Sequence, residues 1–219
     1  MKIRLPAEWE PQDGVLLAWP HPATDWHDQL PEVCTTYTEL IRQIVRFEKV
    51  LLVAPDPETA RQHLSDAGLD LSRIIFCPVA TNDTWTRDFG PITVEVNDQP
   101  VLLDFGFNGW GLKFAANLDN QVTRHLKQQG ALLPRINSIG LVFEGGSIES
   151  DGCGTIMTTS QCLLSPNRNP QLTRQELEGA MQSLFGAQQV LWLEHGHLEG
   201  DDTDAHIDTL ARLCPNDTI

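Results

Sequence analysis

The sequence has little that would place this chain in a membrane, in a disulfide-bonded scaffold or on a nucleic acid. The longest apolar run near its N-terminus, residues 15–19, is far shorter than the ~20 residues that a membrane-spanning helix needs. Its five cysteines are an odd number, are widely spaced and include no C-x-x-C pair, so neither a disulfide framework nor a thiolate zinc site is indicated.

Basic residues are also scarce. Only 15 residues are Lys or Arg against 30 Asp or Glu, and the resulting net charge of -15 repels phosphate backbones and anionic lipids but attracts small cations. The N-terminus carries no apolar stretch or cleavage site typical of exported proteins. We therefore expect a cytoplasmic protein with no nucleic-acid partner, no membrane partner and a small cationic ligand.

Short apolar runs rich in β-branched residues alternate with amphipathic stretches, which is typical of a mixed α/β protein. The order hairpin, helix, strand occurs at least twice, which indicates a structural repeat. No flexible linker or low-complexity tract divides the chain, so we predict a single domain over residues 1–219. The predicted strands are residues 14–19, 49–54, 92–96, 101–105, 147–150, 155–159 and 189–193, and the predicted helices lie around residues 33–44, 118–126 and 173–184.

The densest polar cluster spans residues 194–208 and holds three histidines and six carboxylates. Residues 206–213 begin a strand-like alternation, in which His206 and Asp208 would share one face. An imidazole beside a carboxylate suits general acid–base chemistry or the binding of a cation. The alternative is a solvated acidic loop followed by an edge strand. A metal site is a further alternative, because His195 and His197 also share a face in an extended chain.

Two other segments carry groups that suit a site. Residues 82–91 place Trp85, Arg87 and Asp88 just before a predicted strand, where they could hold a planar cation or form only a structural ion pair and a buried anchor. In the second segment, Glu144 ends an apolar run and is followed by two glycines, which let another backbone or a ligand approach closely. A diglycine is also common in ordinary turns.

Together these segments resemble the agmatine deiminase and bacterial peptidylarginine deiminase family of the pentein fold, whose members modify guanidines. The resemblance is carried by W-T-R-D-F-G-P at residues 85–91, E-G-G-S-I at 144–148 and T-D-A-H-I-D at 203–208. It extends to P-A-E-W-E-P at residues 6–11, L-S-P-N-R-N-P at 164–170 and G-D-D-T-D at 200–204, and so covers essentially the whole chain.

The resemblance implies an α/β propeller of five ββαβ-type repeats, of which this chain would contain about three as a C-terminally truncated fragment of one pentein domain. It implies a hydrolase that converts agmatine to N-carbamoylputrescine and ammonia in putrescine and polyamine biosynthesis. A cysteine thiolate would attack the guanidinium carbon and form a covalent thiouronium intermediate, with no metal and no cofactor. A homodimer is also expected from the resemblance.

The resemblance assigns roles to five residues. His206 would protonate the departing ammonia and later activate water, Asp88 and Asp208 would bind the guanidinium nitrogens, and Glu144 would complete the ring of carboxylates. Trp85 would line the pocket. A guanidinium presents five N–H donors in a plane, and carboxylates accept them bidentately. Because the carboxylates repel one another, we expect raised pKa values in the empty site.

One feature departs from the family pattern. The family nucleophile lies near the C-terminus in a G-G-x-x-x-C setting, and Cys214 lacks those glycines. Cys34, Cys77, Cys153 and Cys162 lie in apolar or hairpin surroundings that favour packing over reactivity. We therefore predict that this chain does not turn over substrate. The alternatives are an arginine or peptidylarginine deiminase, a metal-dependent hydrolase, and a non-catalytic module that binds guanidinium groups.

Overall fold

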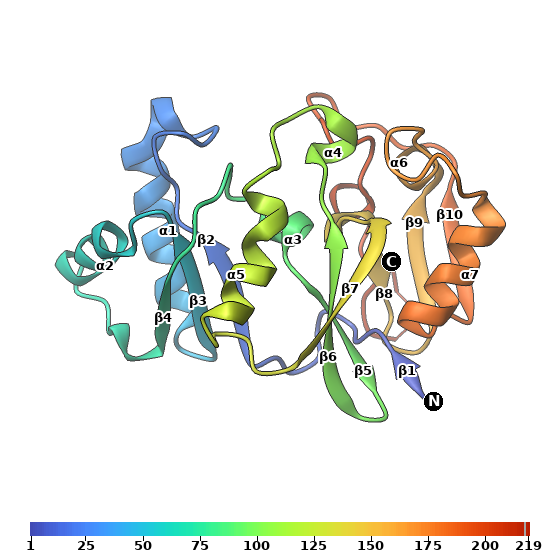
Figure 1. Cartoon of the computed structure of the whole chain (residues 1–219), viewed down its shortest axis with the longest axis horizontal. Helices are drawn as coiled ribbons and strands as arrows, with labels where there is room; N and C mark the ends of the chain where they lie inside the picture. The colour runs from blue at the N-terminus through green and yellow to red at the C-terminus, as the bar shows by residue number, and fades with distance from the viewer. Residues whose placement is uncertain (217) are drawn as a thin grey trace. The chain divides into compact units, whose positions relative to one another are not determined.

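The structure is a computed structural model that describes residues 1–216 and 218–219. It consists of two compact units, which are described separately, and three open β-sheets (Figure 1). Within the described part of the chain, every helix is too short or too polar to span a bilayer. Unit 1 comprises Met1–Glu10, Arg87–Ala115 and Pro134–Ile219, and unit 2 comprises Pro11–Thr86 and Ala116–Leu133.

Unit 2 is built on a parallel sheet of three strands in the order β2-β3-β4. Its apolar strands are connected by helices, as parallel neighbours require, and this confirms the predicted order of strand, helix and strand. The strands are β2 (Gly14–Ala18), β3 (Lys49–Ala54) and β4 (Ile74–Pro78), and the helices are α1 (Leu30–Ile44), α2 (Pro57–Asp66) and α5 (Val122–Gln128), with short 3-10 turns at His27–Gln29, Leu71–Arg73 and Asp119–Gln121.

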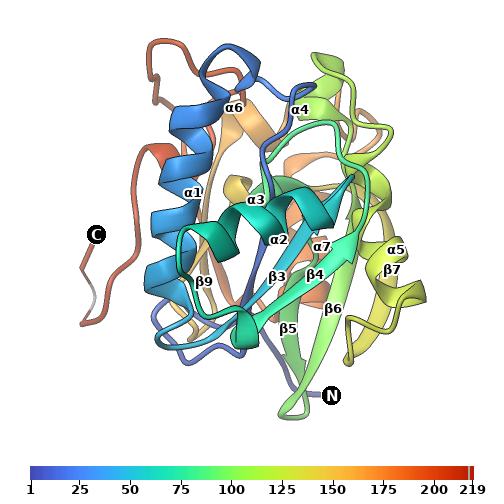
Figure 2. The same cartoon turned by 90° about the vertical axis from the view of Figure 1, so that its left-hand side faces the viewer.

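The core of unit 2 lies between this sheet and helices α1 and α2. Val50 and Leu52 alternate along β3 and pack against Ile41 of α1 and Leu64 of α2, and all four side chains are fully buried. Figure 2 shows α2 lying across β3 and β4. The 3.6-residue period of α1 and the two-residue period of β3 therefore meet in one apolar layer.

Unit 1 contains a four-stranded sheet in the order β1-β5-β6-β7, with β5 antiparallel to both β1 and β6 and with β6 parallel to β7. Asn97 and Asp98 both have positive φ between β5 and β6, which is the geometry of a tight hairpin turn and confirms the predicted hairpin. The strands are β1 (Ile3–Arg4), β5 (Ile92–Val96), β6 (Gln99–Gly106) and β7 (Arg135–Val142).

A second sheet of unit 1 has the order β10-β9-β8. Thr173 and Glu176 form the predicted capping box at the start of α7, and Gly186 ends that helix in the left-handed conformation. Phe185 of α7 packs on Phe105 and Phe143 in the core of this unit. The elements are β8 (Glu149–Ser150), β9 (Thr155–Thr159), β10 (Gln189–Leu193), α6 (Ser160–Leu163) and α7 (Arg174–Phe185).

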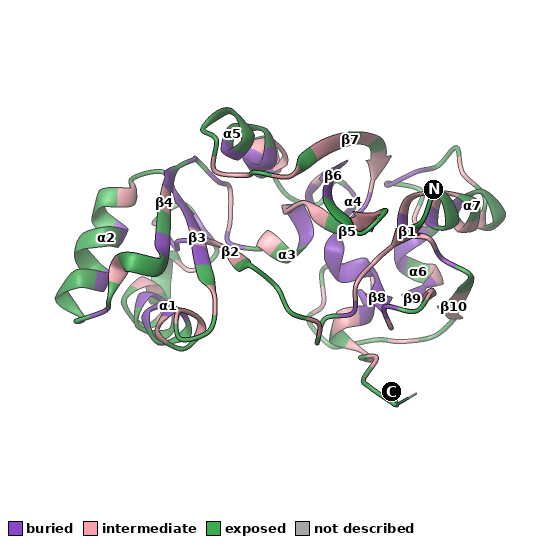
Figure 3. Cartoon of the chain, turned by 90° about the horizontal axis from the view of Figure 1, so that it is seen from below, coloured by how far each residue is buried: buried purple, intermediate pink, exposed green. Residues whose placement is uncertain are grey.

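The predicted mixed α/β class is confirmed, but the strand predicted over residues 206–213 is wrong. A 3-10 turn, η5 (Ile207–Thr209), follows His206 instead. The backbone turns away from an extended path because Asp204 and Ala205 both have positive φ, and because Asp201 Oδ2 accepts a hydrogen bond from the Ala205 amide. Figure 3 shows the buried interior of unit 1 around β8 and α6, where residues 143–150 form an unbroken buried run.

Candidate active site

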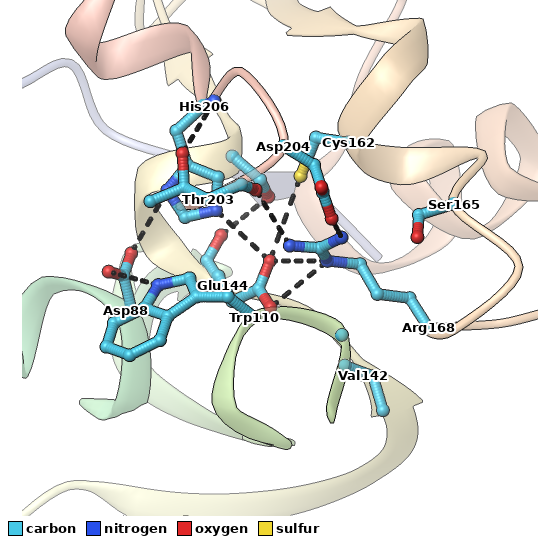
Figure 4. A network of polar contacts seen from close by, with 12 residues as sticks. Asp88, Trp110, Val142, Glu144, Cys162, Ser165, Arg168, Thr203, Asp204 and His206 are labelled. Carbon is cyan, nitrogen blue, oxygen red and sulfur yellow. Dashed lines mark hydrogen bonds and ion pairs between the residues drawn. The ribbon is translucent and has the colours of Figure 1, made fainter. Parts of the chain in front are cut away.

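Four of the predicted site residues meet inside unit 1: Asp88, Glu144, His206 and Asp208. Asp88 lies in the short helix α3 (Thr86–Phe89). Trp110 Nε1 donates to Asp88 Oδ2 over 3.0 Å, and the Gly146 amide donates to Asp88 Oδ1 over 3.0 Å (Figure 4). Trp110 reaches this position from α4 (Gly109–Leu112), where it adopts a left-handed backbone conformation with φ of 55°. These two donors fix the direction of a buried carboxylate.

Glu144 follows β7 and precedes the 3-10 turn η4 (Gly145–Ser147). Its side chain is fully buried, and Figure 4 shows it between His206 and Arg168. Arg168 Nε donates to Glu144 Oε2 over 2.8 Å, and His206 Nε2 lies 3.1 Å from the same oxygen. The thiol of Cys162, from α6, donates to it over 3.8 Å. Glu144 Oε2 is thus in contact with three polar groups.

His206 is held by its main chain as well as by its ring. Its amide donates to Thr203 Oγ1 over 3.0 Å, and its ring is almost wholly buried. The Nε2 edge faces Glu144, and Nδ1 lies 3.5 Å from Asp88 Oδ1. Because both ring nitrogens face carboxylate oxygens, the surroundings favour the imidazolium form, in which both nitrogens donate.

Asp88, His206 and Asp208 converge on one point above Gly146. A Cβ atom built on Gly146 would lie 2.5 Å from His206 Nδ1 and 2.7 Å from both Asp88 Oδ1 and Asp208 Oδ2. Only a residue without a side chain leaves this space open. The predicted grouping of these three residues is therefore present, although it arises from a 3-10 turn and not from the strand face that the sequence suggested.

Asp208 differs from the other carboxylates because one of its oxygens has no partner. Its Oδ1 atom is buried and receives no hydrogen bond from any described residue. Burial raises the pKa of Asp208, and the positive charges of His206, Arg87 and Arg212 oppose that rise. A buried acceptor without a donor is costly, so this atom marks a place where an external N–H group would be stabilised.

The pKa values within the site are shifted in different directions. Burial raises the pKa of Asp88, with an added contribution from Asp208, so the expectation of raised carboxylate pKa values holds for these two residues. Burial would also raise the pKa of Glu144, but the hydrogen bonds and charges of His206 and Arg168 outweigh it and lower that pKa. The surroundings of Glu144 therefore favour its ionised form.

The imidazole of His206 has a strongly raised pKa. Burial alone would lower its pKa, but hydrogen bonds with Cys162 and Glu144 and the negative charge of Asp88 reverse this and raise it to about 10. Burial also raises the pKa of the Cys162 thiol, which is therefore neutral at pH 7, so Glu144 and Asp88 supply the charge. At neutral pH, His206 is an imidazolium ready to donate a proton.

Trp85 belongs to unit 2, unlike the other four predicted site residues. Its ring is 40% exposed and packs against Trp26 with a centroid distance of 5.7 Å. Its role in a pocket stays a prediction. Sequence reasoning missed Trp110, Cys162 and Arg168 as parts of the cluster. Arg168 lies in the L-S-P-N-R-N-P segment that carried the resemblance, but nothing in that segment indicates that its guanidinium reaches Glu144.

The histidines proposed for a metal site do not form one. His195 and His197 are exposed, and the single group of potential metal ligands found among the described residues is Glu144, Cys162 and His206. That group is a poor match for a metal ion, because the Arg168 guanidinium already donates to Glu144 and its positive charge would repel a cation. The donor set instead fits hydrogen-bonded acid–base chemistry.

The three buried cysteines do not meet the requirements of a nucleophile at this site. Cys162 is fully buried, and burial raises its pKa, whereas an attacking thiolate needs a lowered pKa and access to substrate. Cys34 and Cys77 are buried in unit 2 and their pKa values are also raised. Cys153 and Cys214 are exposed.

Comparison with known proteins connects this geometry to one family. Residues 4–219 match the family model of the Porphyromonas-type peptidyl-arginine deiminase. The chain is 36% identical over 212 residues to a protein of Stutzerimonas stutzeri named agmatine deiminase, covering 93% of this chain and 56% of that protein. It is 34% identical to the agmatine deiminase of Medicago truncatula, covering 95% of this chain and 58% of that protein.

Solved structures give the same result. A cysteine-to-serine variant of the agmatine deiminase of C. jejuni, with substrate bound, has a TM-score of 0.89 and 39% identity, covering 97% of this chain and 62% of that one. The agmatine deiminase of Enterococcus faecalis has a TM-score of 0.82 and 31% identity, covering 94% and 56%. The chain thus spans a little more than half the length of the relatives that it matches.

Proposed function

Because the chain belongs to the Porphyromonas-type peptidyl-arginine deiminase family, we propose that its site binds the guanidinium group of a small cation for deimination. The observation that carries this proposal is the Asp208 carboxylate, whose Oδ1 atom is buried and unpartnered. Its Oδ2 atom converges with Asp88 Oδ1 at Gly146, a residue without a side chain. A guanidinium supplies planar N–H donors and a positive charge, and both are what these carboxylates lack.

In the proposed complex, Asp88 and Asp208 each accept hydrogen bonds from the guanidinium nitrogens. Each charge-assisted hydrogen bond contributes about 1.5–3 kcal/mol, and the arriving positive charge also stabilises the ionised form of both carboxylates, whose pKa values are raised mainly by burial. Glu144 was predicted to complete the ring of carboxylates around the substrate. Its oxygens are already engaged by Arg168 and His206, so we assign it to the support of His206.

The proposed reaction is a hydrolytic deimination through a covalent intermediate. A thiolate adds to the guanidinium carbon, the C–N bond to one amino group breaks, and His206 delivers a proton so that ammonia leaves. His206, now neutral, then takes a proton from water, which attacks the thiouronium carbon and releases the thiolate and a urea product. The second proton lost in this step goes to solvent, where the released ammonia takes it up as ammonium. No external oxidant or reductant is needed.

We assign the nucleophile to a cysteine outside these 219 residues, because Cys162, the cysteine that lies beside His206, is fully buried and burial raises the pKa of its thiol. The C. jejuni relative with substrate bound carries serine in place of a cysteine, which supports a cysteine in this role. This chain would then bind the guanidinium without turning it over.

The substrate that we favour is agmatine, with N-carbamoylputrescine as product and a place in putrescine and polyamine synthesis. Several relatives are named agmatine deiminases, which supports agmatine, and the net charge of -15 favours a dication. Free arginine or peptidyl-arginine is the alternative, since the family model is named for the latter. Such substrates would need an additional group that binds a carboxylate or a main chain.

We extend the proposal to the organisation of the whole protein. The chain would form about three of the five blades of a pentein propeller and a fragment of one pentein domain. Its recurring hairpin, helix and strand and its match to the deiminase structures support this. A cytoplasmic homodimer without cofactor or metal is the expected working form.

The test compares the 219-residue chain with the same reading frame extended to the length of the relatives. Isothermal titration calorimetry measures agmatine binding to both, and ammonia release measures turnover in the presence of a chelator. We expect both forms to bind agmatine and only the longer form to release ammonia. Absence of binding to the shorter chain at millimolar agmatine would contradict the assigned site, and ammonia release by the shorter chain would contradict the assigned nucleophile.

A further inference from the structure

Arg168 is the one buried cation of the site that the proposed reaction does not use. Its side chain is fully buried, and each of its three guanidinium nitrogens donates to a different partner group (Figure 4). We propose that Arg168 is a positioning residue, which ties the Glu144 carboxylate to the loop that carries His206 and so keeps the imidazole against its acceptor. This inference rests on the proposed role of His206 as the general acid.

The first contact of Arg168 is with the acceptor of the imidazole. Its Nε atom donates to Glu144 Oε1 over 3.1 Å and to Oε2 over 2.8 Å, and Oε2 is the oxygen that faces His206 Nε2. Burial would disfavour ionised Glu144, and the positive charges of His206 and Arg168 keep it ionised. Without Arg168, a fully buried carboxylate would depend on the imidazolium alone.

The other two contacts are with the loop immediately before His206. Arg168 Nη1 donates to Asp204 Oδ2 over 2.7 Å, and Nη2 donates to the Thr203 carbonyl over 2.9 Å. Asp204 and Ala205 have φ values of 67° and 62°, a left-handed conformation that is unfavourable for non-glycine residues. Arg168 thus stabilises the strained turn that places the imidazole.

The groups that face His206 come from four parts of unit 1. Asp88 lies on α3, Glu144 follows β7, Cys162 lies on α6, and Asp201 and Asp208 flank the residue along its own segment. Arg168 contacts Glu144 among these, so its removal acts on His206 through that acceptor and through the loop. Loss of either constraint separates the imidazole from its carboxylate and lowers its proton affinity.

The geometry requires arginine specifically, because another cation would not make the same three contacts. A planar guanidinium can direct its nitrogens at Glu144, Asp204 and Thr203 at once, whereas a lysine ammonium is a single point charge on a flexible stem. Arg168→Lys keeps the positive charge and loses the fork, and Arg168→Gln loses both. The pair of variants therefore separates positioning from charge.

The test follows the His206 ring in the 219-residue chain by NMR titration, with the signal assigned by its loss in His206→Gln. We expect the His206 pKa to fall by about one unit or more in both Arg168 variants. Arg174→Gln is the matched control, because Arg174 forms an exposed ion pair with Glu194 in the same unit. It should leave the titration unchanged.

Two outcomes would overturn the inference. Folded Arg168 variants with an unchanged His206 pKa would reduce Arg168 to a structural role, and a raised pKa in Arg168→Gln would show that Arg168 acts as a charge alone.

If both variants fail to fold, the wild-type chain provides the test. The chemical shift of the Arg168 Nε–H should change with pH at the midpoint of the His206 titration, and a shift that does not respond overturns the inference. None of these readouts needs substrate, so failure of agmatine to bind would contradict only the proposed function.

Discussion

Replacing Gly146 with alanine adds one methyl group at the point where Asp88, His206 and Asp208 converge. The backbone of Gly146 does not have a positive φ, so alanine fits the main chain and the whole effect comes from the side chain. The new Cβ would lie 2.5–2.7 Å from three polar atoms of the site. Ordinary contact begins near 3.4 Å, so each of these side chains must retreat by roughly 0.7–0.9 Å.

A displacement of nearly 1 Å is large for a charge-assisted hydrogen bond, and misplacement of that size costs on the order of 100-fold in a positioned site. We therefore expect Gly146→Ala to weaken agmatine binding about 100-fold, which corresponds to about 2.7 kcal/mol. Overpacking should also lower the stability of the fold by about 1–3 kcal/mol. Calorimetric titration with agmatine and thermal unfolding measure the two effects.

Gly179→Ala provides the matched control in the same unit. Gly179 lies inside α7, has no positive φ and has no atom within 4 Å of an added Cβ. Alanine there should leave agmatine binding unchanged and raise stability by about 0.5–1 kcal/mol, because glycine weakens a helix interior. Agmatine binding by folded Gly146→Ala with wild-type affinity would refute the placement of the guanidinium above Gly146.

The remaining predictions concern charge, hydrogen bonding and stability. The pKa values of Asp88 and Asp208 are raised, so agmatine affinity should fall as the pH is lowered, and this fall should begin above pH 3.8, the usual pKa of an aspartate. A calorimetric affinity that stays constant down to pH 3.8 would contradict this prediction. Trp110→Phe removes the 3.0 Å hydrogen bond to Asp88 and should reduce that affinity about tenfold by the same assay. The pKa of His206 rises from 6.5 to about 10 on folding, so the stability that protonated His206 contributes is complete below pH 6.5 and is lost as the pH rises through 10. The thermal unfolding midpoint should therefore drop over this pH range in the wild type, and it should drop less in His206→Gln. Thr173→Ala breaks the capping box of α7 and should cost about 1 kcal/mol in chemical denaturation, with agmatine binding unchanged.

Local patterns predicted much of the fold. The capping box at Thr173, the turn at Asn97 and Asp98, and the short apolar strand at Lys49–Ala54 depend on residues close together in sequence, and all three are present in the structure. The segment after His206 was mispredicted for the opposite reason. The turn that leads into it is held by the Ala205 amide, which donates to Asp201, and by Arg168, which donates to the Thr203 carbonyl. Alternation of residue types does not encode these contacts.

The candidate site was predictable in part. Asp88, Glu144, His206 and Asp208 were identified by motif, but their partners were not, because a buried arginine and a tryptophan look ordinary in sequence. Trp110 reaches Asp88 through a left-handed backbone, and Arg168 reaches Glu144 from 24 positions away. The resemblance grouped Glu144 with the substrate ligands, and the sequence did not show that its oxygens contact Arg168 and His206.

Unit 1 is assembled from three stretches that are separate in the sequence, so it cannot fold until late in synthesis. Strand β1 pairs with β5, with Ile3 opposite Val96, so it must wait for about ninety further residues, which take about 5–20 s at ribosomal speed. The residues of unit 2 are complete by Leu133, well before Glu144 and His206 emerge. Contacts of such high sequence separation close slowly, so the segments that carry the site acquire their tertiary contacts last on the nascent chain.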